Sequence, residues 1–181
     1  MAYVLDITGA NIIVVCMYGW SGAHQHAPSV ARTDDLFAIV RAELATHPMS
    51  HQLIAGDING EPEDFPNLVT MIQDEGWTDT GAKAELWGGI AGQPTCHASS
   101  KAKQTRRDYI FVNSLLLPAV AGMRVQDDDT FPTHQPVQIR LATTKLQMTY
   151  RKVQKTNSAA EAVEAKIEAA CEELDGKEKL R

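Results

Sequence analysis

The sequence predicts a mixed α/β (α+β) fold, a layered β-sandwich flanked by helices with a further helix appended at the C-terminus. Short apolar runs with strand character recur through residues 2–142. Between them, two stretches repeat apolar residues every three or four positions, which is the spacing of a helix face. From residue 157 onward Ala, Glu and Lys dominate, as in a solvated helix.

The first two strands are expected at residues 2–7 and 11–18, joined by a turn at residues 8–10. The second run is apolar on both faces, so it should be a central strand, with the first at the edge of the sheet. A loop with two histidines then occupies residues 19–28, and a helix is expected over residues 29–47.

A short buried strand at residues 51–55 leads directly into Gly56-Asp57-Ile58-Asn59-Gly60. A short helix is expected after Pro66, with Gly76 as its stop, and Trp77 opens a further strand. Residues 81–105 form a long irregular stretch of the kind that is often functional. Three more strands are expected, at residues 108–112, about 119–126 and 136–142.

The C-terminal part of the chain is expected to lie outside this domain. Residues 1–144 make up the predicted domain, and residues 145–156 a basic linker. Residues 157–179 predict an amphipathic helix with a narrow, alanine-rich apolar face, which we expect to pack on its own domain.

Composition restricts the function only weakly. Hydrophobic residues make up 44% and charged residues 22%, which is typical of a globular protein. A net charge of -6 does not suit a protein that holds nucleic acid by bulk electrostatics alone. The three cysteines are far apart and predict reduced thiols in an intracellular protein, and no apolar run is long enough to span a membrane.

The strongest local motif is Gly56-Asp57-Ile58-Asn59, placed directly after an apolar strand. At the end of a strand, the Asp57 carboxylate could accept a proton from water or bind a cation, and the Asn59 amide could orient a phosphate. Asp, Asn and Gly also favour tight turns, so a purely structural turn explains this tetrapeptide equally well.

Two more motifs place chemically useful side chains at strand ends. Asp108 opens the apolar strand that follows Arg106-Arg107, and a structural ion pair with either arginine is the alternative interpretation. His134 precedes another strand and lies between two prolines that restrict the backbone around it. The case for function depends on Asp57, Asp108 and His134 occurring together, in this order, each at the end of a strand.

The segments GDIN, RRDYIFVN and THQPV resemble, in this order, three motifs of the endonuclease/exonuclease/phosphatase (DNase-I-like) superfamily. Tyr18, Trp77-Thr78-Asp79 and Pro94-Thr95 match shorter elements of the same family. The resemblance covers about residues 2–142 and is most similar to the endonuclease domains of non-LTR retroelements. It implies a partial DNase-I-like sandwich and a metal-dependent hydrolase of phosphodiester bonds, with nucleic acid as its substrate.

The resemblance also implies a role for each matching residue. Asp57 would activate the attacking water with help from Asn59, Tyr18 would hydrogen-bond a phosphate oxygen, and Asp108 would orient His134. The imidazolium of His134 would stabilise the charge that grows on the phosphate, and Mg²⁺ or Mn²⁺ would act as a Lewis acid. The basic residues near Asp108 would contact a nucleic-acid backbone, although a solvated basic loop is an equal alternative; they are Lys101, Lys103, Arg106 and Arg107.

The chain departs from the family pattern in two ways. The first half of the family's domain, which supplies an asparagine and a metal-binding glutamate, has no counterpart before Met1, and Thr133 stands where the family has a metal-side aspartate. Asp57 is then the one metal ligand that matches, and we expect an uncovered apolar sheet face and a missing half or partner chain.

Three other functions stay open at this point. A phosphomonoesterase or lipid phosphatase would use the same motifs, since these define the chemistry and not the leaving group. A non-catalytic remnant would serve as a binding module. A thiol hydrolase using Cys96 and His97 is disfavoured, because adjacent loop residues do not readily meet in the required geometry.

Overall fold

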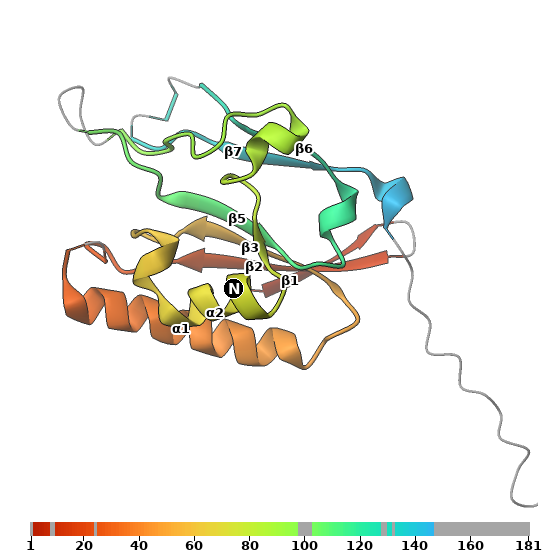
Figure 1. The fold of residues 1–181 in the computed structure, drawn as a ribbon, viewed down its shortest axis with the longest axis horizontal. Helices are drawn as coiled ribbons and strands as arrows, with labels where there is room; N and C mark the ends of the chain where they lie inside the picture. The colour runs from red at the N-terminus through yellow and green to blue at the C-terminus, as the bar shows by residue number, and fades with distance from the viewer. Residues whose placement is uncertain are drawn as a thin grey trace, which may run out of the picture. The chain divides into compact units, whose positions relative to one another are not determined.

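The computed structural model describes residues 2–7, 10–23, 25–97, 103–127, 130–131 and 133–146. These residues belong to one compact unit, and they form a layer of helices, a five-stranded sheet and a two-stranded sheet (Figure 1). The expected basic linker at residues 145–156 lies almost entirely outside the described residues, and the expected helix at residues 157–179, Lys101 and Cys171 lie wholly outside them.

The five-stranded sheet has the order β1-β2-β3-β5-β4. Its strands are β1 (Ala2–Ile7), β2 (Ala10–Tyr18), β3 (His51–Asp57), β4 (Thr78–Asp79) and β5 (Asp108–Val112). β2 and β3 are parallel, whereas β1, β5 and β4 pair antiparallel with their neighbours. The expectation that β2 is internal and β1 lies at the edge of the sheet is confirmed.

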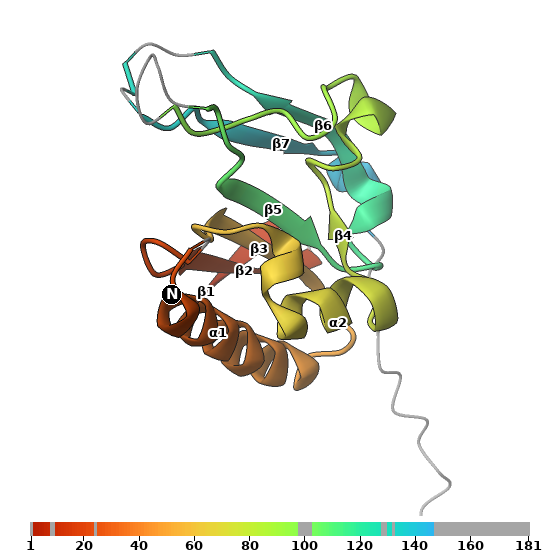
Figure 2. The ribbon, with the colours of Figure 1, turned by 60° about the vertical axis from the view of Figure 1, so that its left-hand side comes forward.

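Two helices cover one face of this sheet, as Figure 2 shows. They are α1 (Ala27–Ala45) and α2 (Pro66–Asp74), and their apolar sides pack on the sheet through Phe37, Leu44, Leu68 and Met71. α1 begins two residues earlier than expected. Pro28 lies in its first turn, where the missing backbone N–H of proline costs no hydrogen bond.

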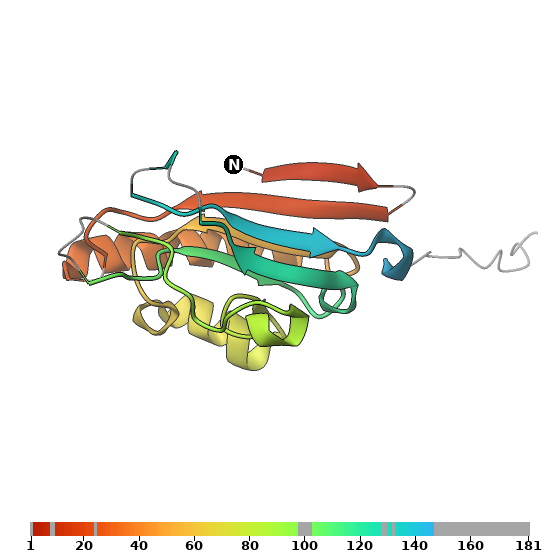
Figure 3. The same cartoon turned by 90° about the horizontal axis from the view of Figure 1, so that it is seen from above.

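The opposite face packs against a second sheet formed by β6 (Val120–Val125) and β7 (Val137–Leu141), which pair antiparallel (Figure 3). A second apolar core fills the space between the sheets, with Ile12, Ile110, Leu116 and Met123 among its buried members. The two sheets therefore form the layered sandwich that the sequence predicts.

Short 3₁₀ segments connect these elements. They are η1 (Pro62–Asp64), η2 (Ala84–Trp87), η3 (Leu117–Ala119) and η4 (Thr143–Lys145). η2 falls within the stretch at residues 81–105 that we expected to be irregular, so this stretch contains a local turn of helix. No helix among the described residues is both long and apolar enough to cross a membrane.

The edge strand β1 is more exposed than the rest of the sheet. Tyr3, Val4 and Leu5 are exposed over about half of their surface or more, at 51%, 65% and 48%. Tyr3 and Leu5 pair with Val14 and Ile12, whose side chains face the second core, so this face continues onto β1. Among the described residues, apolar side chains are therefore exposed along this edge of the sheet, and the expected missing half or partner chain stays a prediction.

Candidate active site

The predicted site residues Asp57, Asp108 and His134 meet at one position in the molecule. Asp57 is the last residue of β3 and Asp108 is the first of β5, and the two are direct partners because these strands are antiparallel. His134 lies three residues before β7, where an isolated bridge to Cys96 fixes its backbone. Antiparallel pairing and the approach to β7 therefore bring together residues that are far apart in the sequence.

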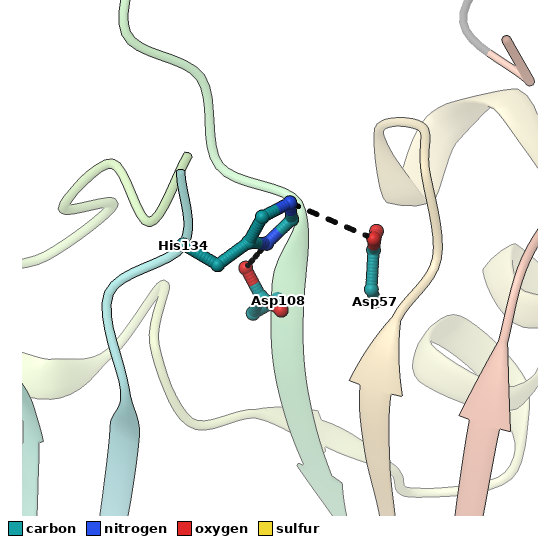
Figure 4. Close-up of side chains that lie close together, drawn as sticks. All are labelled: Asp57, Asp108 and His134. Carbon is teal, nitrogen blue, oxygen red and sulfur yellow. Dashed lines mark hydrogen bonds and ion pairs between the residues drawn. The ribbon is translucent and has the colours of Figure 1, made fainter. Parts of the chain in front are cut away.

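The three side chains point toward one another, as Figure 4 shows. His134 Nδ1 lies 2.8 Å from Asp108 Oδ2, which is a hydrogen bond, and His134 Nε2 lies 3.9 Å from Asp57 Oδ2. Because Asp108 accepts a hydrogen bond from Nδ1, the ring orientation is fixed and Nε2 faces Asp57. The carboxylate of Asp108 thus orients the imidazole toward the second acid.

A threonine that the sequence indicated only as part of a short motif supports Asp108. The Thr95 hydroxyl donates to Asp108 Oδ2 at 2.7 Å and accepts from the backbone N–H groups of Arg107 and Asp108, each at 3.0 Å. Thr95 is only 1% exposed. Its position beside Asp108 depends on the bridge between Cys96 and Thr105, which no local motif encodes.

Asp57 is held by the turn that follows it. Its Oδ1 atom accepts the backbone N–H of Asn59 at 2.9 Å, and Asn59 adopts a left-handed backbone with φ of 54°. The Asn59 side chain donates to the carbonyl oxygen of Gly19 at 2.9 Å and so joins this turn to the end of β2. The tight turn therefore positions the Asp57 carboxylate, so the structural and the functional interpretations of this motif do not exclude each other.

Burial raises the pKa of the Asp57 carboxyl above its ordinary value of 3.8. The hydrogen bond from Asn59 lowers this pKa, the negative charge of Asp108 raises it, and the positive charges of His134 and Arg107 lower it. Burial is the largest of these effects. Asp57 is consequently a stronger base than an exposed aspartate.

Tyr18 is the last residue of β2, and it is the partner of Asp57 in the parallel pairing of β2 with β3. Its side chain is 67% exposed, so its hydroxyl group is accessible to a ligand. Thr133 is exposed, and its carbonyl oxygen accepts the backbone N–H of His97. Thr133 is not part of the three-residue cluster.

The two neighbouring arginines have different surroundings. Arg106 forms a two-pronged ion pair with Asp79, and its guanidinium lies 4.1 Å from the centre of the Tyr109 ring. The buried Asp79 therefore engages both terminal nitrogens of Arg106, and the expected contact of Arg106 with substrate stays a prediction. Arg107 is buried, at 9% exposed, and the ion pairs of the described residues include none between Arg107 and Asp108.

The thiol of Cys96 lies near the cluster without being activated. Burial raises its pKa, and the negative charges of Asp108 and Asp57 raise it further. A thiol with a raised pKa is protonated at neutral pH and is a poor nucleophile. This electrostatic environment disfavours the thiol hydrolase reading.

Asp57, Asp108 and His134 also form a group that could hold a metal ion. One ligand atom from each lies within 4.8 Å of the others. Carboxylate oxygens suit a hard divalent cation such as Mg²⁺, whereas an imidazole nitrogen suits transition metals. Because Asp108 already binds Nδ1 of the imidazole, Asp57 has the carboxylate oxygen best placed for a cation.

A pocket of about 300 Å³ opens beside the imidazole and is lined mainly by apolar side chains, among them Ala55, Ile110, Phe131 and Val137. A larger hollow of about 560 Å³ lies between η2 and the β6–β7 pair. None of the three clustered residues lines that larger hollow, so the pocket at His134 is the relevant one for chemistry.

No family model matches this chain, and no curated protein matches it. Solved structures do match its fold. The 3′ phosphatase NExo from Neisseria, bound to a product DNA hairpin, has a TM-score of 0.56 and 18% sequence identity, over 77% of this chain and 64% of that one. An AP endonuclease from Archaeoglobus fulgidus has a TM-score of 0.53 and 14% identity over the same shares.

A third match is an endonuclease/exonuclease/phosphatase family protein from Leptotrichia buccalis, with a TM-score of 0.53 and 17% identity, over 77% of this chain and 52% of that one. The fold is DNase-I-like. The chain spans less than two thirds of the length of each of these three structures. The DNase-I-like fold predicted from the sequence is confirmed, whereas the finer likeness to retroelement endonucleases stays a prediction.

Proposed function

We propose that this chain carries the hydrolytic residues of a metal-dependent phosphodiesterase that acts on nucleic acid. The observation that carries the proposal is the cluster of Asp57, Asp108 and His134, with the imidazole held between two carboxylates at 2.8 Å and 3.9 Å. This arrangement provides a base, an oriented proton donor and a fixing group around one position, which is what hydrolysis of a phosphoester requires.

The gap between Asp57 and His134 is the proposed reaction position. Its 3.9 Å exceeds a hydrogen bond, and an oxygen atom about 2.8 Å from each side chain would contact both. Asp57, with its pKa raised by burial, accepts the proton of the attacking water. His134 donates from Nε2 to a phosphate oxygen, and Asp108 stabilises the imidazolium through Nδ1.

The oxygen of Asp57 that faces the gap suits a hard divalent cation, since the other oxygen of this carboxylate already accepts from Asn59. Mg²⁺ or Mn²⁺ held there by Asp57 would act as a Lewis acid toward the phosphate oxygens. Asn59 fixes the carboxylate, and the exposed hydroxyl of Tyr18, level with Asp57 in the sheet, contacts a phosphate oxygen.

Exposed aromatic side chains near the cluster favour nucleic acid as the substrate. Tyr18 is 67% exposed at the end of β2, and Phe131, 51% exposed, lines the pocket at His134. Aromatic rings stack on nucleobases, each stack contributing about 1–3 kcal/mol. One structure with this fold was solved with a product DNA hairpin bound, which agrees with the same substrate class.

Hydrolysis assays with matched variants test the proposal. The 181-residue chain with Mg²⁺ should cleave duplex DNA containing an abasic site faster than it releases phosphate from an inositol phosphate. His134→Ala should lower cleavage by about 10²- to 10⁴-fold, as loss of a general acid does. His47→Ala, which removes an exposed histidine beyond α1, should leave the rate unchanged.

Three results would count against this assignment. Equal cleavage by the wild type and by His134→Ala would remove the catalytic role of the cluster. Faster hydrolysis of the inositol phosphate would instead support the phosphomonoesterase alternative. Absence of cleavage by the wild type would favour a binding module.

A further inference from the structure

The side chain of Arg107 has an unusual environment for a charged residue. It is only 9% exposed, and its Nη1 atom is buried without a hydrogen-bond partner anywhere in the described part of the chain. The adjacent Arg106 is only partly buried, and both of its terminal nitrogens bond to Asp79. The two neighbouring arginines therefore differ in their hydrogen bonding, because Arg107 has a buried donor without a partner.

The backbone of Arg107 is held on both sides, so this position is built into the fold. Its N–H donates to the Thr95 hydroxyl at 3.0 Å, and its carbonyl oxygen accepts the N–H of Ile58 at 2.9 Å. Arg107 thus joins the threonine that supports Asp108 to the turn that carries Asp57. The residue lies between the two halves of the candidate active site.

The charge of Arg107 acts on this site. Its positive charge lowers the pKa of Asp57 and of Cys96, although burial, which raises both, has the larger effect. The two carboxylates of the site have other partners, however. Asp57 accepts from Asn59, and Asp108 accepts from Thr95 and His134.

A buried guanidinium nitrogen without a partner is unfavourable, because taking a charge and its donors out of water must be offset by new interactions. Arginine has only donors, so the group that completes it must be an acceptor, and an anion is the most favourable one. The planar guanidinium matches the oxygens of a phosphate, which it binds through two parallel hydrogen bonds.

We propose that the Arg107 guanidinium binds a non-bridging oxygen of the substrate phosphate beside Asp57, and that it is the anion-binding residue of the active site. The inference rests on the proposed function in that it takes the substrate to be a phosphoester. It adds a buried positive charge to a site whose two acids would otherwise repel a phosphate. It also assigns different roles to the two arginines, which the sequence leaves equivalent.

Binding of inorganic phosphate, followed by NMR titration of the full chain without metal, tests this assignment apart from catalysis. Arg107→Met should weaken phosphate binding by about tenfold to a hundredfold, the loss expected for hydrogen bonds to a charged group. Arg107→Lys should lose less phosphate affinity than Arg107→Met, since lysine keeps the positive charge although it lacks the planar guanidinium group. Arg140→Met, which removes the same charge from an exposed site on β7, should bind phosphate like the wild type.

The outcomes separate this inference from the proposed function. Phosphate binding by Arg107→Met as tight as in the wild type, or no binding by the wild type, would overturn the assignment. If Arg107→Met does not fold, equal binding by Arg107→Lys and the wild type would overturn it. Loss of phosphate binding in the Arg107 variants of a chain that hydrolyses nothing would support the anion site while rejecting the catalytic proposal.

Discussion

Replacing Thr95 with valine should both destabilise the protein and impair the active site. Valine keeps the shape of threonine and removes only the hydroxyl group. That hydroxyl makes three hydrogen bonds, one to Asp108 Oδ2 and two from the N–H groups of Arg107 and Asp108. A hydroxyl has one donor and two acceptor positions, so every one of them is in use.

The magnitude follows from these three contacts. Each N–H left unsatisfied costs about 1–3 kcal/mol, and a hydrogen bond to a charged carboxylate contributes about 1.5–3 kcal/mol. Asp108 is partly exposed and recovers some hydration, so the lower values apply, and the free energy of unfolding should fall by about 3 to 4 kcal/mol. For a chain of this size the melting temperature should then fall by roughly 10 °C.

Urea unfolding and thermal melting followed by circular dichroism measure this loss. Thr95→Ser is the matched control, because it keeps the hydroxyl and should lose no more than about 1 kcal/mol from its missing methyl group. The free energy of unfolding of Thr95→Val should therefore be at least about 1 kcal/mol lower than that of Thr95→Ser. A smaller difference would mean that the hydroxyl does not stabilise the start of β5 as described. Any hydrolytic activity should follow the same order, with serine retaining more than valine.

Two further predictions concern charged groups. Because burial raises the pKa of Asp57 in the folded state, the stability linked to this group is complete below its ordinary pKa of 3.8 and is lost as the pH rises through the folded pKa. Without metal, Asp57→Asn should therefore melt higher than the wild type at about pH 7 but not at about pH 3; the same difference at both would contradict the linkage. Arg106→Met leaves buried Asp79 without its ion-pair partner and should cost about 3–5 kcal/mol in urea unfolding. Arg41→Met, which breaks a solvent-exposed pair with Glu75, should cost much less, and equal losses would contradict the distinction.

The positions of the strands along the chain could be predicted because their signals are local. The apolar run before Tyr18 and the one before Asp57 identify β2 and β3, and the acid that opens an apolar strand identifies β5. Asp57 and Asp108 lie at strand ends, as the hydrophobic pattern predicts, whereas His134 lies three residues before β7. The meeting of the two acids depends on the antiparallel pairing of β3 with β5, which the pattern does not specify.

Other features depend on contacts between distant residues. Thr95 contacts Asp108 only because the chain between them folds back, and neither composition nor spacing encodes that return. The pairing of Arg106 with Asp79 likewise joins β4 to the entrance of β5 across 27 residues. From the sequence, Arg106 and Arg107 were equally suited to bind substrate, and only burial and partners distinguish them.

A double-mutant cycle on Asp108 and His134 tests the central claim most directly, since the claim is that Asp108 acts through the imidazole. The rate of Mg²⁺-dependent cleavage of abasic-site DNA should fall in Asp108→Asn and in His134→Ala. The double variant should be no slower than His134→Ala alone, because residues that act as one unit have non-additive effects. Losses that multiply in the double variant, or a rate unaffected by either change, would contradict the account.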